Sequence, residues 1–277
     1  MGLRIATNTT SLAAQRTLGA NNTEQANTLN KLSSGTRITR SADDAAGLAI
    51  SEKLRAQIRS TNQAERNAND GVSMIQTAEG GLSEIGNILV RMRELSVQSA
   101  SDTVGDTERK FTDLEYQNLK QEIERISQVT EFNGKKLLNG AGEKYDFQIG
   151  INNDEFQDRI SFDTQLLNSS VSNLAVDSLS VTSKEDAQVG LESLDNAIQM
   201  VSGQRAELGA KQNRLTSTVN NLQITSENLS SANSRIRDTD FAAETAKNTK
   251  LNILTNAGTS VLAQSNSQGQ AALKLIG

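Results

Sequence analysis

Apolar residues recur at alternating steps of three and four residues along two long stretches of the chain. In the first stretch, from Ile50 to Ser96, ten of fourteen such positions are apolar. In the second stretch, from Ala187 to Ile236, eleven of fifteen are apolar. A repeat sustained over this length is typical of helices that pack together as a coiled coil, so we expect two long helices that face each other.

Two further features complete the helical pattern. Ser183 as N-cap, with Asp186 three residues later, predicts a capping box at the start of the second long helix. A shorter helix is expected over about residues 106–129. Its apolar residues are Phe111, Leu114, Leu119, Ile123 and Ile126.

Between the long helices the period changes from that of a helix to that of strands. "FNGKKLL" and "LNGAG" each contain an Asn-Gly turn signal, and the apolar residues nearby alternate, namely Tyr145, Phe147, Ile149, Ile160 and Phe162. We expect a small β-hairpin region packed on the helices. Residues 163–182 are rich in Ser and Asn without a sustained period, which predicts an exposed connection that tolerates insertions.

The two ends of the chain have only thin apolar stripes. Most other residues over 3–33 and 241–276 are Ala, Asn, Gln, Ser or Thr. A stripe this thin buries too little surface to offset the chain entropy alone, so we expect two terminal helices that pair and become ordered on assembly. Its members are Leu12, Leu29 and Leu32 at one end, and Leu254, Ala257, Val261, Leu273 and Ile276 at the other.

Composition supports long helices and narrows the function classes. None of the 277 residues is Pro, Cys, His or Trp, which excludes disulfides, structural zinc fingers and thiol catalysis. A net charge of -5 provides no general basic surface for nucleic acid. No apolar run reaches the roughly 18 residues that span a bilayer, and the start "MGLRIATN" lacks the apolar region of a secretory signal. We therefore expect no nucleic-acid partner, no membrane insertion and no conventional signal peptide.

The stretch "KLSSGTRITRSADDAAGLAI", residues 31–50, reads as a joint between two helices. Gly35 is expected as a left-handed C-cap, and Ser41 as the next N-cap, with Asp43 and Asp44 at the second and third helical positions. The alternative, a carboxylate pair for acid–base catalysis, needs a neighbour that separates the two pKa values. Because adjacent helical residues point in different directions, capping is favoured. No other motif of the sequence predicts a catalytic residue, a cofactor site or a metal site.

Five motifs resemble one family in its own order along the chain. They are "NKLSSGTRITRSADDAAGLAI", "RNANDGVSMIQTAEGGLSEI", "RMRELSVQSA", "FNGKKLLNG" and "AGTSVLAQSNSQGQAALKLIG". Together they closely resemble bacterial flagellin over nearly the whole chain. The resemblance implies paired terminal helices that line a filament core and a helical rod around them. With the helix patterns, it divides the chain into 1–43 and 237–277 (terminal-helix domain), 44–162 (rod helices and hairpins), 163–182 (connection) and 183–236 (returning rod helix).

The resemblance also implies function and partners. We expect a structural subunit that polymerises with itself into the extracellular flagellar filament, which drives swimming. Export would use the flagellar type III apparatus and a chaperone, and the filament cap and hook-junction proteins would be further partners. Some flagellins are recognised by the vertebrate flagellin-sensing Toll-like receptor, and their contact surface for it includes the positions matched here by Arg91, Leu95 and Glu115. Position 90 is Val, where the receptor-active pattern usually has Gln.

The chain differs from the usual flagellin pattern at two points, and three other interpretations of its function stay open. The outer domains that many flagellins insert are absent, residues 163–182 standing in their place, and the two chain ends differ from the commonest family ends. The hook–filament junction protein shares terminal helices but diverges across the middle motifs. An enzyme would have to work with Asp, Glu, Ser and Lys alone. A monomeric coiled-coil adaptor would share the apolar repeats but not the ends built to order on assembly.

Overall fold

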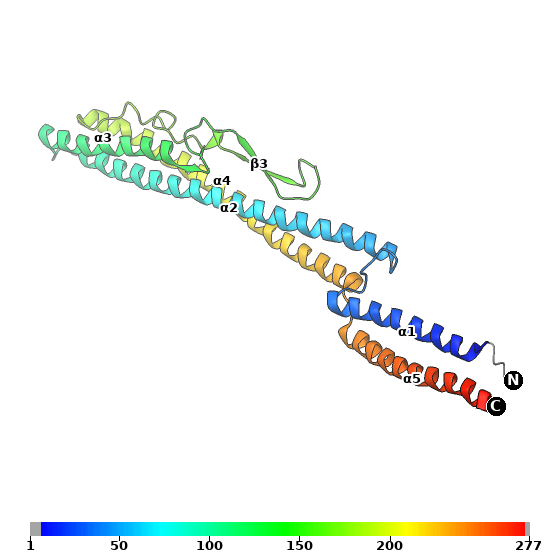
Figure 1. The fold of residues 1–277 in the computed structure, drawn as a ribbon. Coiled ribbons are helices and arrows are strands. Elements are labelled where there is room, and N and C mark those ends of the chain that lie inside the picture. Colours follow the sequence, from blue (N-terminus) through cyan, green and yellow to red (C-terminus); the bar gives the residue numbers. More distant parts are fainter. Residues whose placement is uncertain (1–6, 275–277) are drawn as a thin grey trace. The chain divides into compact units, whose positions relative to one another are not determined.

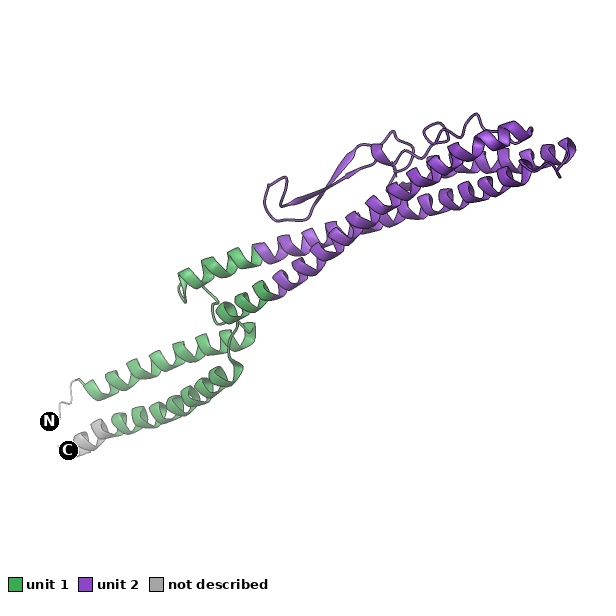
Figure 2. Cartoon of the chain, turned by 180° about the vertical axis from the view of Figure 1, so that it is seen from behind, with its two compact units in different colours: residues 1–56, 228–277 green, residues 57–227 purple. Residues whose placement is uncertain are grey.

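The computed structural model describes residues 7–274, with side chains over residues 7–267. The chain forms two compact units, residues 1–56 with 228–277 and residues 57–227, which are coloured separately in Figure 2. Expectations for the side chain of Leu273 and for Ile276 lie outside the described residues. So do the outermost parts of the two terminal ranges.

The larger unit, 57–227, contains parts of two long antiparallel helices, α2 (Ala45–Ser99) and α4 (Lys184–Arg237), seen in Figure 1. The two helices are antiparallel, because Asn62 near the start of α2 binds Ser226 near the end of α4, whereas Arg93 near the end of α2 binds Asp195 near the start of α4. From Thr61 to Ser96 every position of the first apolar repeat is buried. The predicted pair of facing helices is therefore confirmed, and this seam is the core of the unit.

One position of the second repeat differs from the pattern. Arg205 is exposed, and the neighbouring Gln204 is buried in its place. The amide of Gln204 accepts a hydrogen bond from Ser169 Oγ at 2.9 Å and donates to the carbonyl of Leu166 at 3.2 Å. A buried amide satisfied in this way fixes the chain segment that crosses α4.

The third helix of this unit, α3 (Asp106–Val129), has the predicted bounds, but two of its apolar residues do not face the core. Phe111 and Leu114 are 66% and 63% exposed. The face that packs against the core instead runs through Arg109, Tyr116 and Ile123, at seven-residue spacing. The apolar residues of the sequence pattern include Ile123 of this face but not Arg109 or Tyr116.

Arg109 is buried because it binds the end of the preceding helix. Its Nε donates to the carbonyl of Ser99 at 2.9 Å, and its Nη2 donates to the carbonyl of Ser101 at 3.0 Å. Its Nη1 pairs with Asp106 at 2.8 Å. The last carbonyls of a helix lack partners within the helix, so one guanidinium closes α2 and orients α3.

The hairpin region is confirmed. Strands β1 (Glu131–Phe132) and β2 (Lys135–Lys136) pair across Asn133 and Gly134, whose φ values of 50° and 76° fit a two-residue hairpin turn. Strands β3 (Lys144–Gln148) and β4 (Arg159–Asp163) pair antiparallel, with Tyr145 opposite Phe162. Ile149, Ile160 and Phe162 are buried, and Tyr145 and Phe147 are half-buried against the core.

The expectation of an exposed connection over 163–182 is wrong. From the end of a short 3-10 helix, η1 (Gln165–Leu167), onwards, five apolar side chains of this segment enter the core. The backbone N–H of Val171 also donates to Glu124 Oε2 of α3 at 3.0 Å. The segment has no helical or strand period because it is irregular, not because it is solvated. Its buried apolar residues are Leu167, Val171, Leu174, Val176 and Val181.

The other unit contains the terminal helices α1 (Thr9–Ser34) and α5 (Phe241–Lys274), which lie side by side (Figure 1). Their contacts are largely polar, including an ion pair between Glu24 and Lys247. At the far end Ser11 Oγ donates to Asn266 Oδ1 at 2.9 Å. The predicted pairing of terminal helices is confirmed, whereas their gain of order on assembly stays a prediction.

Candidate functional site

The joint between α1 and α2 is built in the same unit as the terminal helices. Gly35 adopts φ 70° and its N–H donates to the carbonyl of Lys31 at 2.9 Å, so the predicted left-handed C-cap is confirmed. The chain then runs extended against the segment that follows α4. Arg37 N–H donates to the carbonyl of Arg237 at 2.6 Å, and Thr239 N–H donates to the carbonyl of Gly35 at 3.0 Å. These bonds tie both connections of the joint together.

The predicted helix start at Ser41 is wrong. A turn closed by the Asp43 N–H and the Arg40 carbonyl at 3.0 Å occupies Ser41 to Asp43, and α2 begins at Ala45. Asp44 is the N-cap, because its Oδ1 accepts the N–H of Gly47 at 2.8 Å. Sequence reasoning placed the joint correctly but could not foresee that a turn would use the first three residues of the expected helix.

Asp43 has a different role from the predicted one. Its Oδ2 accepts the Thr39 hydroxyl at 2.8 Å and the backbone N–H groups of Thr39 and Arg40, each at 3.0 Å. The Thr39 hydroxyl, followed by these two backbone groups, holds the pKa of Asp43 below its ordinary value. The two carboxylates thus act separately, one on the turn and one on the helix start.

Gly47 lets the joint close on the first turn of α2. A Cβ at this position would lie 2.4 Å from Asp44 Oδ2 and 2.8 Å from Ile38 Cδ1. Ile38 is the buried apolar residue of the extended stretch, at 2% exposure. A side chain at position 47 would therefore displace either the N-cap or the apolar contact of the joint.

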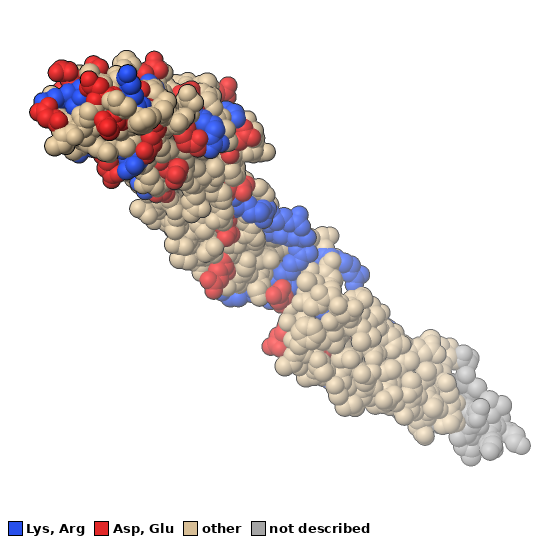
Figure 3. Space-filling model, turned by 90° about the vertical axis from the view of Figure 1, so that its left-hand side faces the viewer, with Lys and Arg blue, Asp and Glu red and all other residues tan. Residues whose placement is uncertain are grey.

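The terminal helix pair has a surface with few charges, which appears mostly tan in Figure 3. Over the described side chains, α1 carries Arg16, Glu24 and Lys31. Large apolar side chains are exposed on both helices, and such residues on a weakly charged surface are typical of a protein contact. They are Leu12, Leu29, Phe241, Ile253, Leu254 and Val261.

A second candidate surface lies where α2 packs beside α3. Arg91 Nη2 pairs with Glu115 Oε1 at 2.9 Å, and both side chains are about half exposed. Hydrogen bonds to Glu94 and Glu115 raise the pKa of Arg91. Leu95, the third matched position, is only 2% exposed and belongs to the core, so its side chain is not accessible on this surface. Its side chain packs inside the helix seam.

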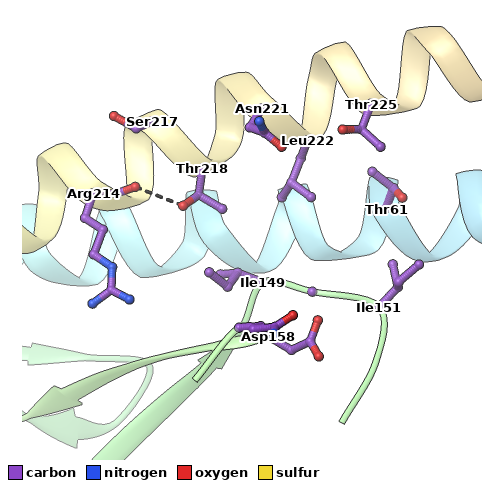
Figure 4. A pocket seen from close by; sticks show the side chains of 12 residues that line it. Thr61, Ile149, Ile151, Asp158, Arg214, Ser217, Thr218, Asn221, Leu222 and Thr225 are labelled. Carbon is purple, nitrogen blue, oxygen red and sulfur yellow. Dashed lines mark hydrogen bonds between the residues drawn. The ribbon is translucent and has the colours of Figure 1, made fainter. Parts of the chain in front are cut away.

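A groove opens between α2, α4 and the loop that joins β3 to β4, with a cavity volume of about 510 Å³. Figure 4 shows Ile149 and Leu222 facing it among hydroxyl groups of α4. Asp158 at its edge is engaged within the loop, since its carboxylate accepts the N–H of Asp154 at 2.9 Å. The other side chains of the groove offer van der Waals contact and neutral hydrogen bonds, with Arg214 as a charged donor at its edge.

Over residues 7–274, no helix combines the length and the apolar character that a bilayer crossing requires. Among the same residues, no cluster of three or more Asp and Glu side chains is placed to hold a metal ion.

Comparisons with known proteins identify the family. Residues 5–143 match the model of the bacterial flagellin N-terminal helical region, and residues 191–276 match that of the C-terminal helical region. The chain belongs to the bacterial flagellin family. It is 45% identical to the flagellin of Halalkalibacterium halodurans, with 97% of this chain and 98% of that protein covered. It is 43% identical to a flagellar filament 30.7 kDa core protein of Treponema maltophilum, with the same coverage.

Solved structures agree with this flagellin assignment. The crystal structure of Bacillus cereus flagellin is 32% identical, with a TM-score of 0.50, covering 57% of this chain and 88% of that chain. A candidate flagellar hook-associated protein of Vibrio parahaemolyticus has a TM-score of 0.60 at 14% identity, which shows a shared fold alone. As a flagellin, the chain is a structural subunit of the flagellar filament.

Proposed function

We propose that this flagellin polymerises through its terminal helices, α1 and α5, with copies of itself, and that the filament is extracellular. The observation that carries the proposal is the set of exposed apolar side chains on this helix pair, whose surface has few charges. Burying these side chains against neighbouring copies removes apolar surface from water at each contact. The role requires no catalysis, and none is proposed.

A pair of α5 variants tests this proposal. Ile253 is 63% exposed, whereas Leu251, two residues earlier, is buried. Ile253→Ser is expected to leave the circular dichroism spectrum of the monomer unchanged and to slow seeded elongation. Leu251→Ser is expected to lower the stability of the helix pair itself. If Ile253→Ser and other exposed-face variants elongate filaments as fast as the unchanged chain, the terminal pair is not the assembly surface.

We also propose export by the flagellar type III apparatus, with a chaperone, as the resemblance to flagellin implies. The polar contact between α1 and α5 supports this, because a pair held by few apolar contacts is easily separated before export. A chaperone that covers the apolar face of α5 would also prevent early polymerisation. The filament cap and the hook-junction proteins would contact the same terminal helices at the two ends of the filament.

We also propose that the vertebrate flagellin-sensing Toll-like receptor binds this chain at Arg91 and Glu115, the exposed part of the matched surface. Arg91 offers a planar set of donors, and Val90 beside it is exposed. Arg91→Ala is expected to reduce signalling by monomer in reporter cells while the helical content stays unchanged. Leu95→Ala would act through the core and lower thermal stability as well. An inactive unchanged monomer, or a fully active Arg91→Ala monomer, would refute receptor recognition.

A further inference from the structure

The two Asn-Gly pairs of the hairpin region occupy different environments. Asn133 and Gly134 form the exposed turn between β1 and β2, and a Cβ placed on Gly134 would meet no atom within 4 Å. Asn139 and Gly140 are half-buried. There Asn139 Oδ1 accepts the N–H of Ala141 at 3.1 Å, and a Cβ on Gly140 would lie 2.5 Å from the Asn168 side chain.

We propose that Asn133 is a site of spontaneous deamidation, and that the fold protects Asn139 from the same reaction. An asparagine followed by glycine is prone to this reaction because glycine has no side chain to block its own backbone nitrogen. The local chemistry of the two pairs is the same, so the folded structure decides between them. The inference is independent of filament assembly, because it concerns the isolated chain.

The reaction needs only water. The backbone nitrogen of Gly134 attacks Cγ of Asn133, and a five-membered imide forms as the bond from Cγ to the side-chain nitrogen breaks. That nitrogen leaves as ammonia, carrying the proton lost from the Gly134 amide. Water then adds to either imide carbonyl and breaks its bond to nitrogen. The products are aspartate, or isoaspartate when the main chain passes through the former side chain.

The turn at Asn133 can open for this attack with little cost. Each strand of the hairpin has two residues, and a hairpin this short is marginally stable without its packing. Opening the turn exposes no buried side chain of the turn itself, because Asn133 and Gly134 are already in solvent. At Asn139 the same movement must first break the bond to Ala141 and displace Asn168.

Either product would change the hairpin. Aspartate adds a negative charge two residues from Lys135, whose Nζ lies 4.1 Å from the centroid of the Tyr145 ring. Isoaspartate also lengthens the main chain of the turn by one methylene group. The pairing of Glu131 with Lys136 then loses its register, and Phe132 loses its fixed position beside the core.

Incubation of the full folded chain in water enriched in oxygen-18, followed by peptide mass spectrometry, tests the proposal. The heavy oxygen marks only carboxyl groups formed during the incubation, and isoaspartyl methyltransferase reports isoaspartate independently. A parallel sample unfolded in urea is the control, and the Asn133→Gln chain confirms the peptide assignment. Asn133 is expected to react about three- to tenfold faster than Asn139 in the folded chain, the factor expected when one ordinary hydrogen bond must open first.

In urea the two rates are expected to become comparable, because the protection of Asn139 is lost on unfolding. Two results would overturn the proposal. One is equal labelling of the two asparagines in the folded chain. The other is no labelling of Asn133 in the folded chain while both asparagines react in urea.

Discussion

Asp44 Oδ1 accepts the backbone N–H of Gly47 at 2.8 Å, and this bond marks the start of α2 at Ala45. The first N–H groups of a helix have no partner within it, so a side-chain acceptor at the N-cap stabilises the end. Gly47 also lies close to Ile38, the buried apolar residue of the joint. The N-cap bond and the apolar contact of the joint therefore meet at Gly47.

Removing this cap tests the helix start. Asp44→Ala is expected to lower stability by about 0.5–2 kcal/mol and to speed amide exchange at Gly47. Ser41→Ala is the matched control, because Ser41 lies in the preceding turn, and its effect should stay within about 0.5 kcal/mol. A larger effect from Ser41 than from Asp44 would show that the helix begins earlier than Ala45.

The seam of the larger unit is tested by two neighbouring positions of one repeat. Leu208 is fully buried, so Leu208→Ala is expected to cost about 2–5 kcal/mol in urea unfolding. Arg205 belongs to the same apolar repeat but its side chain is 43% exposed and lies 3.8 Å from Glu79. Arg205→Ala should therefore change stability by no more than about 0.5 kcal/mol. Equal costs at the two positions would contradict the observed seam.

The turn of the joint is expected to depend on acid pH. Hydrogen bonds from Thr39 and Arg40 lower the pKa of Asp43, so the unfolded chain binds the proton first as the pH falls. The contribution of Asp43 is therefore complete above its ordinary value of 3.8 and is lost as the pH falls through the lower folded pKa. Amide shifts of Thr39 and Arg40 measured by NMR should titrate with a midpoint below 3.8. In Asp43→Asn this titration should disappear.

Tyr116 gives the opposite pH dependence in alkali. Its hydroxyl is buried without a hydrogen-bond partner in the described structure, and burial raises its pKa to about 12. Above the unfolded value of about 10, the unfolded chain releases this proton while the folded chain keeps it, so stability falls as the pH rises from about 10 to about 12. Tyr116→Phe should remove that part of the pH dependence. At neutral pH it should cost little, because an unpaired buried hydroxyl contributes no net stabilisation.

The sequence predicted the elements that depend on periodic patterns. The seam from Thr61 to Ser96, the bounds of α3 and the turn at Asn133 and Gly134 all follow from local spacing or turn chemistry. Each is specified by residues close together in the chain. For such features, pattern and structure agree.

The errors arose where polar residues enter the interior or where contacts are distant in sequence. Arg109 is buried because it binds the end of α2, which an apolar count does not register. Val171 enters the core from an irregular segment held by Glu124, which lies far away in the chain. Leu95, which the resemblance places on a receptor-contact surface, lies in the core of the larger unit. In each case a tertiary contact decided the burial.

The central claim is that the terminal helices carry the assembly of this flagellin. The most direct test adds heat-dissociated chain, or a chain trimmed to residues 44–236, to fragments of its own filament and measures elongation by electron microscopy. The full chain is expected to lengthen the fragments, and the trimmed chain is expected to remain helical but not to add to them. Elongation by the trimmed chain, or failure of the intact chain to elongate, would contradict the account.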